Sequence, residues 1–357
     1  MKKYFMGFIA VILTAGCLSA CSATNTSSTA VEDRIQIVTT IFPEYDWVMN
    51  ILGSNADDAD VTMLLDNGVD LHSYQPTAED ILKISACDMF IYVGGESDEW
   101  VEDALKEAQN KDMAVINLME VLGDSVREEE FVEGMQEEEH EHEHEAGDDA
   151  EAEYGHKDDH ADEHGEDHAD EHEDEEGEAE YDEHVWLSLR NAAILTEYIS
   201  KELERIDEKN AENYEKNTGD YVSKLNELDK QYSDTVSNAG VKTLLFGDRF
   251  PFRYLTDDYG LSYYAAFMGC SAETEASFDT IMFLAGKVDE LSLHAVMTIE
   301  GKDKRIAETI IQNTESRDQQ ILTMNSMQST TSKDVKEGAA YLSIMEENLS
   351  VLSEALK

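Results

Sequence analysis

Positive charge is scarce in this sequence. Its 357 residues include 26 Lys and Arg against 80 Asp and Glu, which gives a formal net charge of −54. Proteins that bind nucleic acid neutralise phosphates with basic side chains, and anionic lipid surfaces attract basic segments. The composition therefore excludes nucleic-acid binding through phosphate neutralisation and disfavours attraction to an anionic membrane surface. Cations are the expected partners of such a chain.

Long hydrophobic runs are also missing. The apolar run at the N-terminus covers only residues 4–16, and these 13 residues are fewer than the roughly 20 that a membrane-spanning helix needs. Lys2 and Lys3 precede the run, as in the positively charged start of a secretory signal peptide. The segment therefore indicates export of the protein rather than a membrane span.

A motif for lipid attachment follows this run. Leu18-Ser19-Ala20-Cys21 resembles the lipobox of bacterial lipoproteins, with Cys21 as the lipidated residue. Cys17 is a weaker alternative, and cleavage without lipidation is another. The next residues are rich in Ser, Thr and Asn, which is typical of a flexible tether. We expect residues 1–20 to be a lipoprotein signal peptide and 21–33 a tether, so that lipid alone anchors the protein to the outer face of the cell membrane.

Only two cysteines remain outside the N-terminal segment, Cys87 and Cys270. An exported protein can form disulfides. However, Cys87 begins an apolar run, and Cys270 lies in an expected turn far along the chain. Two buried or half-buried thiols are the favoured interpretation.

The acidic residues are unevenly spread. Residues 137–183 hold 26 Asp and Glu, one Lys and eight of the eleven histidines. This composition offers almost nothing apolar to bury, so we expect a disordered acidic insert when no metal is present.

The histidines of the insert are candidates for auxiliary metal capture. Three alternate with glutamates and five recur at every fourth position: His140, His142, His144, and then His156, His160, His164, His168, His172. If the second block became helical, its imidazoles would lie along one face and pairs four residues apart could chelate Zn²⁺.

Short apolar runs alternate with helical stretches on both sides of the insert. Strands are expected at 35–40, 61–65, 89–93, 114–118, 243–246, 262–267, 295–299 and 320–324. Helices are expected at 44–52, 78–85, 100–109, 279–290, 304–313 and 334–355. Strands that alternate with helices favour parallel sheets with helices on both faces. The predicted fold class is α/β, with two (βα)4-type lobes in residues 34–136 and 241–357.

The two lobes are joined by residues 184–240. Within them, residues 189–237 contain no proline and a single glycine, and their apolar residues recur at helical spacing. We expect one or two helices that form a stiff connection. Lobes joined in this way leave a cleft beyond the carboxyl ends of their strands, where ligands bind in such folds.

Two histidines outside the insert stand in distinctive segments. His72 lies in Asp-Leu-His-Ser-Tyr-Gln-Pro-Thr at 70–77, and His184 in Asp-Glu-His-Val-Trp-Leu-Ser at 182–188. These segments resemble the substrate-binding lipoproteins of zinc and manganese ABC importers, most closely the zinc-uptake branch. Members of that family carry one metal-ligand histidine in a His-x-Tyr/Phe-Glu/Gln-Pro segment and another in a Pro-His-Val-Trp-Leu-like segment. A His-rich acidic insert precedes the second.

Further motifs extend the resemblance over essentially the whole mature chain. They are Val93-Gly94-Gly95 with Glu99-Trp100, Tyr259-Gly260-Leu261, the run Ser-Ala-Glu-Thr-Glu-Ala-Ser at 271–277, and Asn348-Leu349. The resemblance implies a monomeric extracytoplasmic receptor, not an enzyme, that captures Zn²⁺ in the cleft and delivers it to an ABC permease and its ATPase.

The resemblance also implies a ligand set in which His72 and His184 bind the metal. The family's third ligand lies in a His-x-x-Phe-Gly-Tyr segment, where this chain has Arg249 at the histidine position. A guanidinium has no lone pair to give to a metal. The third ligand is then either Asp248, with its side chain directed into the cleft, or a carboxylate from elsewhere in the chain, such as Glu300 after the strand at 295–299. Arg249 would then orient that carboxylate.

Other polar residues near these motifs are weaker candidates. Asp303 is a rival to Glu300, Glu273 and Glu275 are expected to cap a helix, and His294 is expected to be structural. Two histidines and a carboxylate also suit Mn²⁺. The histidine tract favours Zn²⁺, and Mn²⁺ remains the weaker alternative.

Two other classes of function compete with import. A metal-buffering or adhesive surface lipoprotein would use the acidic insert as its working part. A zinc hydrolase would need an open coordination position and a general base, and the sequence contains no His-Glu-x-x-His or Gly-x-Ser-x-Gly motif.

Overall fold

The structure is a computed structural model that describes residues 34–136, 180–271, 275–301 and 303–357. Residues 35–357 form one compact unit. The expected signal peptide, the tether, the lipidation site Cys21, the eight histidines of the insert and Glu273 lie outside the described residues. No helix among the described residues combines the length and the apolar character that crossing a membrane requires.

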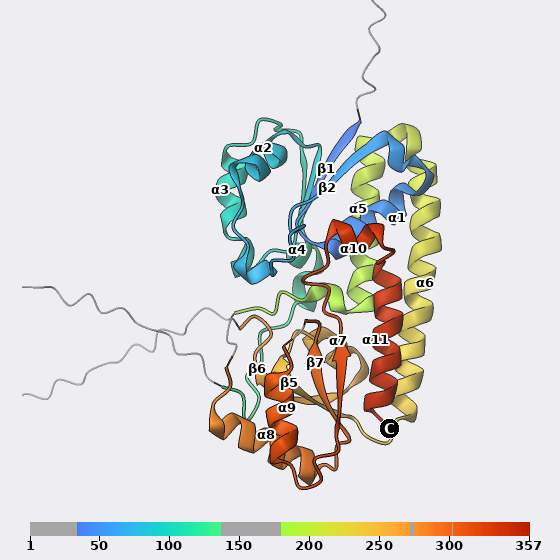
Figure 1. Cartoon of the computed structure of the whole chain (residues 1–357). Coiled ribbons are helices and arrows are strands. Elements are labelled where there is room, and N and C mark those ends of the chain that lie inside the picture. Colours follow the sequence, from blue (N-terminus) through green and yellow to red (C-terminus); the bar gives the residue numbers. More distant parts are fainter. Residues whose placement is uncertain (1–33, 137–179, 272–274, 302) are drawn as a thin grey trace, which may run out of the picture. The chain divides into compact units, whose positions relative to one another are not determined.

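The first half of the unit contains a parallel four-stranded sheet (Figure 1). Its strands are β1 Ile35–Thr39, β2 Ala59–Met63, β3 Met89–Tyr92 and β4 Ala114–Asn117, in the order β2-β1-β3-β4. Its helices are α1 Phe42–Leu52, α2 Ala78–Ala86, α3 Trp100–Lys106 and α4 Leu118–Leu122. Helix α2 begins at a capping box, in which Thr77 and Asp80 each accept a hydrogen bond from the other's backbone N–H.

The second half repeats this arrangement. Strands β5 Thr243–Arg249, β6 Ser262–Phe267, β7 Ala295–Ile299 and β8 Gln320–Met324 form a parallel sheet in the order β6-β5-β7-β8. Its helices are α7 Arg253–Tyr259, α8 Phe278–Glu290 and α9 Arg305–Asn313. Both sheets are parallel throughout, as the alternation of strands and helices predicts.

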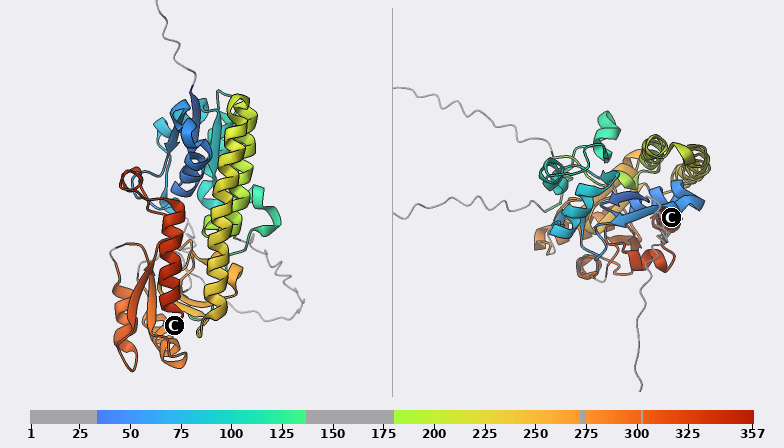
Figure 2. Two further views of the ribbon diagram at one scale, coloured as in Figure 1. Left: turned by 90° about the vertical axis from the view of Figure 1, so that its right-hand side faces the viewer. Right: turned by 90° about the horizontal axis from the view of Figure 1, so that it is seen from above.

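Two helices, α5 Leu189–Ile206 and α6 Ala211–Asn238, connect the halves. Helix α6 has 28 residues and a length of about 42 Å. Asn217 Nδ2 donates to Ile51 O of α1 at 2.9 Å, and Tyr232 OH donates to Met345 O of the C-terminal helix α11 (Tyr341–Ala355) at 2.6 Å. Figure 2 shows α6 and α11 side by side. Helix α6 therefore holds elements from both halves of the chain.

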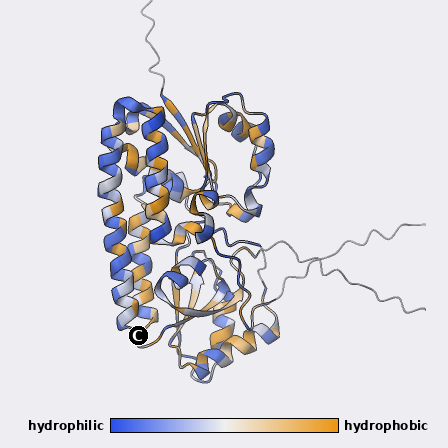
Figure 3. Ribbon diagram, turned by 180° about the vertical axis from the view of Figure 1, so that it is seen from behind, coloured by the Kyte–Doolittle hydropathy of each residue, from blue (hydrophilic) through white to orange (hydrophobic). Residues whose placement is uncertain are grey.

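The hydrophobic core is continuous through most of the unit. One apolar cluster takes residues from both sheets and from α5, α6 and α11, while a smaller one lies between the second sheet and helices α8 and α9. Trp186 is fully buried in the large cluster, where its Nε1 donates to Ser326 O at 2.8 Å and its carbonyl accepts from Tyr341 OH at 2.6 Å. Along α6, hydrophobic and hydrophilic residues alternate (Figure 3), and the buried ones recur at helical spacing.

The expected elements match the structure closely, and the differences have local causes. The expected helix at 334–355 is in fact two, α10 Ser332–Lys336 and α11, because Gly338 adopts a φ of 108° between them. Strand β5 continues to Arg249 instead of ending at 246, and α7 was not expected from the sequence. The connection contains two helices, separated at Asp207, whose carboxylate accepts from Tyr214 OH at 2.6 Å.

A buried carboxylate lies in the turn after β3. Asp98 is 3% exposed, and its Oδ2 accepts a hydrogen bond from Gly94 N at 3.0 Å. Burial raises the pKa of Asp98 to about 7, against the opposing effect of that hydrogen bond, and the nearby Glu183 raises it further.

We expect Asp98 to make folding stability decrease as pH rises from about 4 to 7. In this range the folded protein keeps a proton on Asp98 that the unfolded chain has released. Asp98→Asn should remove this contribution, which has a maximum slope of about 1.4 kcal/mol per pH unit. Urea unfolding between pH 4.5 and 7 measures the slope, with Asp103→Asn, at an 88% exposed carboxylate, as the control. Equal slopes for wild type and Asp98→Asn would contradict the expectation.

Candidate metal centre

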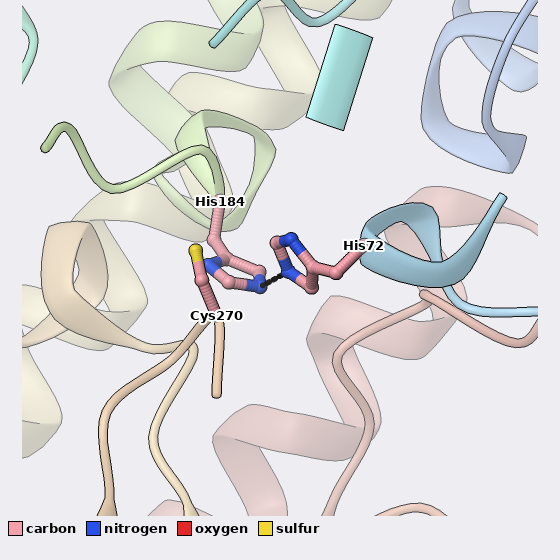
Figure 4. Close-up of side chains that lie close together, drawn as sticks. All are labelled: His72, His184 and Cys270. Atoms are coloured by element: carbon pink, nitrogen blue, oxygen red, sulfur yellow. Dashed lines mark hydrogen bonds between the residues drawn. The ribbon is translucent and has the colours of Figure 1, made fainter. Parts of the chain in front are cut away.

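Three potential metal ligands converge from separate segments of the chain. His72 lies in a short 3₁₀ turn, Leu71–Ser73, after β2; His184 directly precedes the 3₁₀ turn Val185–Leu187; and Cys270 follows β6. One ligand atom from each residue lies within 4.8 Å of the other two. The two imidazole Nε2 atoms are 3.3 Å apart, and the thiol lies beside the ring of His184 (Figure 4). The structure thus brings together the two histidines that the sequence singles out, and adds a thiol.

His72 is held at its backbone and at its ring. The side chain of Asp70 accepts a hydrogen bond from His72 N at 3.1 Å, which caps the turn. At the ring, Nδ1 lies 2.8 Å from Ser97 Oγ and 3.3 Å from Glu183 Oε2. These contacts favour the tautomer with the proton on Nδ1, which leaves the Nε2 lone pair for a metal.

His184 is fully buried and is oriented by Asp182. Its Nδ1 lies 3.0 Å from Asp182 Oδ1, and the same oxygen accepts from His184 N at 2.8 Å. Burial by itself lowers the pKa of His184, but the charge and hydrogen bond of Asp182 outweigh it and raise the pKa above its usual value. Here too the Nδ1 contact leaves Nε2 as the free ligand atom.

Glu183 completes the support of His72. It is 2% exposed, and its Oε1 accepts from Ser97 N at 2.8 Å. Burial raises the pKa of Glu183, but its bonds with His72 and Ser97 outweigh that effect and hold the pKa below its usual value. Glu183 is therefore ionised at neutral pH.

Cys270 is the ligand candidate that sequence reasoning missed. Its backbone N–H donates to Glu129 Oε1 at 3.1 Å. Burial raises the pKa of the Cys270 thiol well above its usual value, and the charge of Glu129 raises it further. The thiol is protonated in the metal-free protein, so metal binding there would release a proton. The sequence offered one clue, because Cys270 follows the carboxyl end of a strand, where ligands of α/β folds gather.

Gln328 places its side-chain amide against both imidazoles. Its Nε2 lies 2.5 Å from His184 Nε2 and 3.4 Å from His72 Nε2, and its Oε1 lies 3.2 Å from Ser326 Oγ. The amide donates to the lone pairs that a metal would use. A half-turn of the amide would instead direct Oε1, an acceptable metal ligand, at the same position.

Asp248 and Glu300, the two expected carboxylate ligands, are not part of this cluster. Asp248 accepts from Ile299 N at 3.3 Å and Arg249 N at 3.0 Å. Glu300 accepts from Ser326 N at 2.6 Å and Ser326 Oγ at 2.8 Å. Both line a neighbouring cavity of about 350 Å³. Among the described residues, the structure therefore brings Cys270, and neither of these carboxylates, beside the two histidines.

Arg249 also has another partner than expected. Its guanidinium pairs with Asp70, which lies in the first half of the chain, and not with Asp248 or Glu300 as the carboxylate that it orients. Asp303 pairs with Arg305 and is exposed. His294 Nε2 lies 2.9 Å from Glu354 O, which agrees with a structural role.

The end of the acidic insert also needs correction. Its expected boundary at 183 includes Asp182 and Glu183, but these two residues are each 2% exposed and orient the histidines. They belong to the folded site, because their carboxylates have partners there that an insert exposed to solvent would lack.

Comparison with known proteins identifies the family. The family model described as zinc-uptake complex component A, periplasmic (ZnuA), matches residues 37–355. The chain belongs to the ZnuA family.

Named relatives of this ZnuA-family chain include zinc-binding proteins of streptococci and bacilli. The zinc-binding lipoprotein AdcA of Streptococcus pneumoniae strain R6 is 29% identical over 359 residues, which cover 99% of this chain and 61% of AdcA. The high-affinity zinc uptake system protein ZnuA of Bacillus subtilis strain 168 is 26% identical over 358 residues, covering 100% of this chain and 99% of that protein. This chain thus spans about three fifths of the length of AdcA.

A solved structure shares the fold. The crystal structure of the Zn(II)-bound ZnuA-like domain of Streptococcus pneumoniae AdcA has a TM-score of 0.64 at 27% identity, with 90% of this chain and 99% of that domain covered. The two parallel sheets described above are therefore the α/β fold of this family.

The cluster predicts a thiolate–metal bond. Addition of Co²⁺, a spectroscopic substitute for Zn²⁺, should produce a near-ultraviolet thiolate-to-metal charge-transfer band. Cys270→Ser should lose the band. Cys87→Ser should keep it, because Cys87 is 1% exposed and its Sγ contacts Ile84 O and Met113 Sδ, outside the cluster. Persistence of the band in Cys270→Ser would show that the thiol does not bind the metal.

Proposed function

We propose that this chain is the substrate-binding component of an ABC zinc importer. It captures one Zn²⁺ between His72, His184 and Cys270 and delivers it to a permease that an ATPase drives. The observation that carries the proposal is the convergence of two oriented imidazoles and a thiol. Membership of the ZnuA family and the names of its zinc-binding relatives support the same activity.

The ligand types favour zinc over manganese. Imidazole and thiolate are the ligands that Zn²⁺ prefers, whereas Mn²⁺ suits oxygen-rich sites. The candidate set here is two imidazoles and a thiol. With Cys270 in place of the expected carboxylate, the argument for manganese loses its main support.

The site is suited to binding and not to hydrolysis. A hydrolytic zinc site needs a carboxylate or imidazole placed to activate a metal-bound water. Of the carboxylates beside the cluster, Asp182 and Glu183 each face the Nδ1 atom of a histidine, on the side of the ring away from its ligand atom. Glu129 accepts the backbone N–H of Cys270, and Asp70, whose Oδ1 lies 3.9 Å from His72 Nε2, is paired with Arg249.

The same proposal includes the location of the protein. Lipidation at Cys21 and the tether at 21–33 would hold a monomer at the outer face of the cell membrane, in reach of a permease. The acidic insert would collect Zn²⁺ weakly near the tight site.

We expect His72→Ala and His184→Ala each to weaken zinc binding strongly. Loss of a residue that only hydrogen-bonds a metal ligand typically lowers affinity about 10–100-fold, and loss of a direct ligand should lower it at least as much. Competition with a fluorescent chelator measures the affinity. Asp248→Ala and His294→Ala are controls that should bind nearly as tightly as wild type.

The same variants test the role in import. Cells that depend on this protein should fail to grow in zinc-depleted medium with His72→Ala and should grow with His294→Ala. If His72→Ala and His184→Ala both bind zinc as tightly as wild type, the proposed site is wrong.

We also expect removal of residues 137–179 to separate the tight site from weaker zinc capture. The deletion retains Glu180–Glu183, so both supporting carboxylates remain. One tight zinc should still bind, whereas the additional weak equivalents should disappear with the eight histidines of the insert. Zinc analysis after equilibrium dialysis gives the stoichiometry. A deletion variant that keeps its circular dichroism spectrum but binds no zinc would instead favour a buffer whose working part is the insert.

A further inference from the structure

Arg249 lies between the two loops that carry His72 and Cys270. It is the last residue of β5, and its guanidinium makes contacts in two directions. Nη2 pairs with Asp70 Oδ2, and Nη1 donates to Ser271 O at 3.4 Å. One side chain thus reaches the loop after β2 and the loop after β6.

Each of these contacts is to a residue that directly adjoins a candidate metal ligand, through a hydrogen bond or along the chain. The second oxygen of Asp70, Oδ1, accepts the backbone N–H of His72 at 3.1 Å. Ser271 directly follows Cys270 in the chain. The Arg249 and Asp70 side chains are only 20% and 18% exposed, so their ion pair is better shielded from solvent than an ordinary surface pair.

We propose that Arg249 is a positioning residue for the metal, which links the loop of His72 to the loop of Cys270 and so sets the separation of these two ligands. The proposal rests on the proposed function, because it assigns Arg249 a role in the same zinc site. The guanidinium does not bind the metal; it acts through Asp70 and Ser271.

The positioning role predicts that zinc binds more weakly without Arg249, whereas electrostatics alone predicts that it binds more tightly. A positive charge near a cation site repels the cation, so a variant without it would bind Zn²⁺ more tightly if charge were the only effect. Loss of the link between the loops would instead weaken binding. The sign of the change therefore separates the two roles.

The test measures zinc affinity for Arg249→Gln, Arg249→Lys and Asp70→Asn in the full chain. We expect Arg249→Gln to bind Zn²⁺ about 10–100-fold more weakly, the range for losing a group that orients a metal ligand. Arg249→Lys keeps the charge but reaches one loop at a time, so its affinity should be intermediate. Asp70→Asn keeps an oxygen for His72 N and loses the ion pair, but it also removes a negative charge 3.9 Å from His72 Nε2, so its affinity should fall for both reasons.

Arg305→Gln is the matched control. Arg305 lines the same cavity as Arg249, but within the described part of the chain its ion pair is with Asp303, two residues away, and it is 68% exposed. This substitution removes the same charge without touching a ligand loop. Its zinc affinity should be unchanged or slightly higher.

The Co²⁺ spectrum adds a readout that general stability does not affect. Arg249→Gln should shift or weaken the thiolate charge-transfer band, because Cys270 loses the anchor at Ser271, whereas Arg305→Gln should keep the wild-type band. Thermal unfolding of the metal-free variants shows whether each is folded. If Arg249→Gln does not fold, Arg249→Lys decides the proposal by the same measurements, because it keeps the charge and changes only the link between the loops.

The outcomes distinguish this inference from the proposed function. If wild type binds Zn²⁺ through His72 and the folded Arg249 variants bind it equally or more tightly with an unchanged Co²⁺ spectrum, the positioning role is overturned and the zinc site stands. If His72→Ala binds as tightly as wild type, the site itself is wrong and the inference falls with it.

Discussion

Two consecutive carboxylates, Asp182 and Glu183, control both candidate imidazole ligands. Asp182 Oδ1 lies 3.0 Å from His184 Nδ1, and Glu183 Oε2 lies 3.3 Å from His72 Nδ1. Each carboxylate faces the Nδ1 edge of its histidine, where Ser97 Oγ also lies 2.8 Å from His72 Nδ1, and so favours the tautomer in which Nε2 carries the lone pair that a metal requires. One dipeptide thus orients two histidines that are 112 positions apart in the chain. The rest of the site depends on keeping this dipeptide buried and satisfied.

Burying two ionised carboxylates is costly unless each has close partners. Asp182 is hydrogen-bonded through its carboxylate to His184 and through its carbonyl to Tyr254 OH at 2.7 Å. Glu183 accepts from Ser97 N in the turn after β3. Gly95 in that turn has a φ of 80°, and a Cβ there would lie 2.4 Å from Glu183 Oε1. The glycine therefore makes room for the carboxylate, which gives a physical reason for Gly95 in the Val93-Gly94-Gly95 segment.

Regular elements and motif residues could be predicted from the sequence, but the other residues that surround the two histidines could not. Strands β6, β7 and β8 match their expected bounds, because short and largely apolar runs alternate with helical stretches in this part of the chain. His72 and His184 stand in motifs. Cys270 and Gln328 do not, and they reach the site through loops whose paths depend on tertiary packing. Arg249 is excluded as a ligand by the chemistry of its guanidinium, and its pairing with Asp70 joins residues 179 positions apart, which no local pattern encodes.

A thiol in place of a carboxylate also changes how charge is distributed. The metal-free site already holds the buried carboxylates Asp182 and Glu183 beside the histidines and the half-buried Glu129 beside Cys270, while Asp70 is paired with Arg249. A thiolate would be a further negative charge, and burial together with its acidic neighbours accordingly raises the pKa of Cys270. A divalent cation removes that penalty, because it offsets the thiolate and is attracted by the same carboxylates. Burial first, and then the negative charge of its neighbours, favours the protonated thiol, and the same negative charge attracts the metal whose binding would displace that proton.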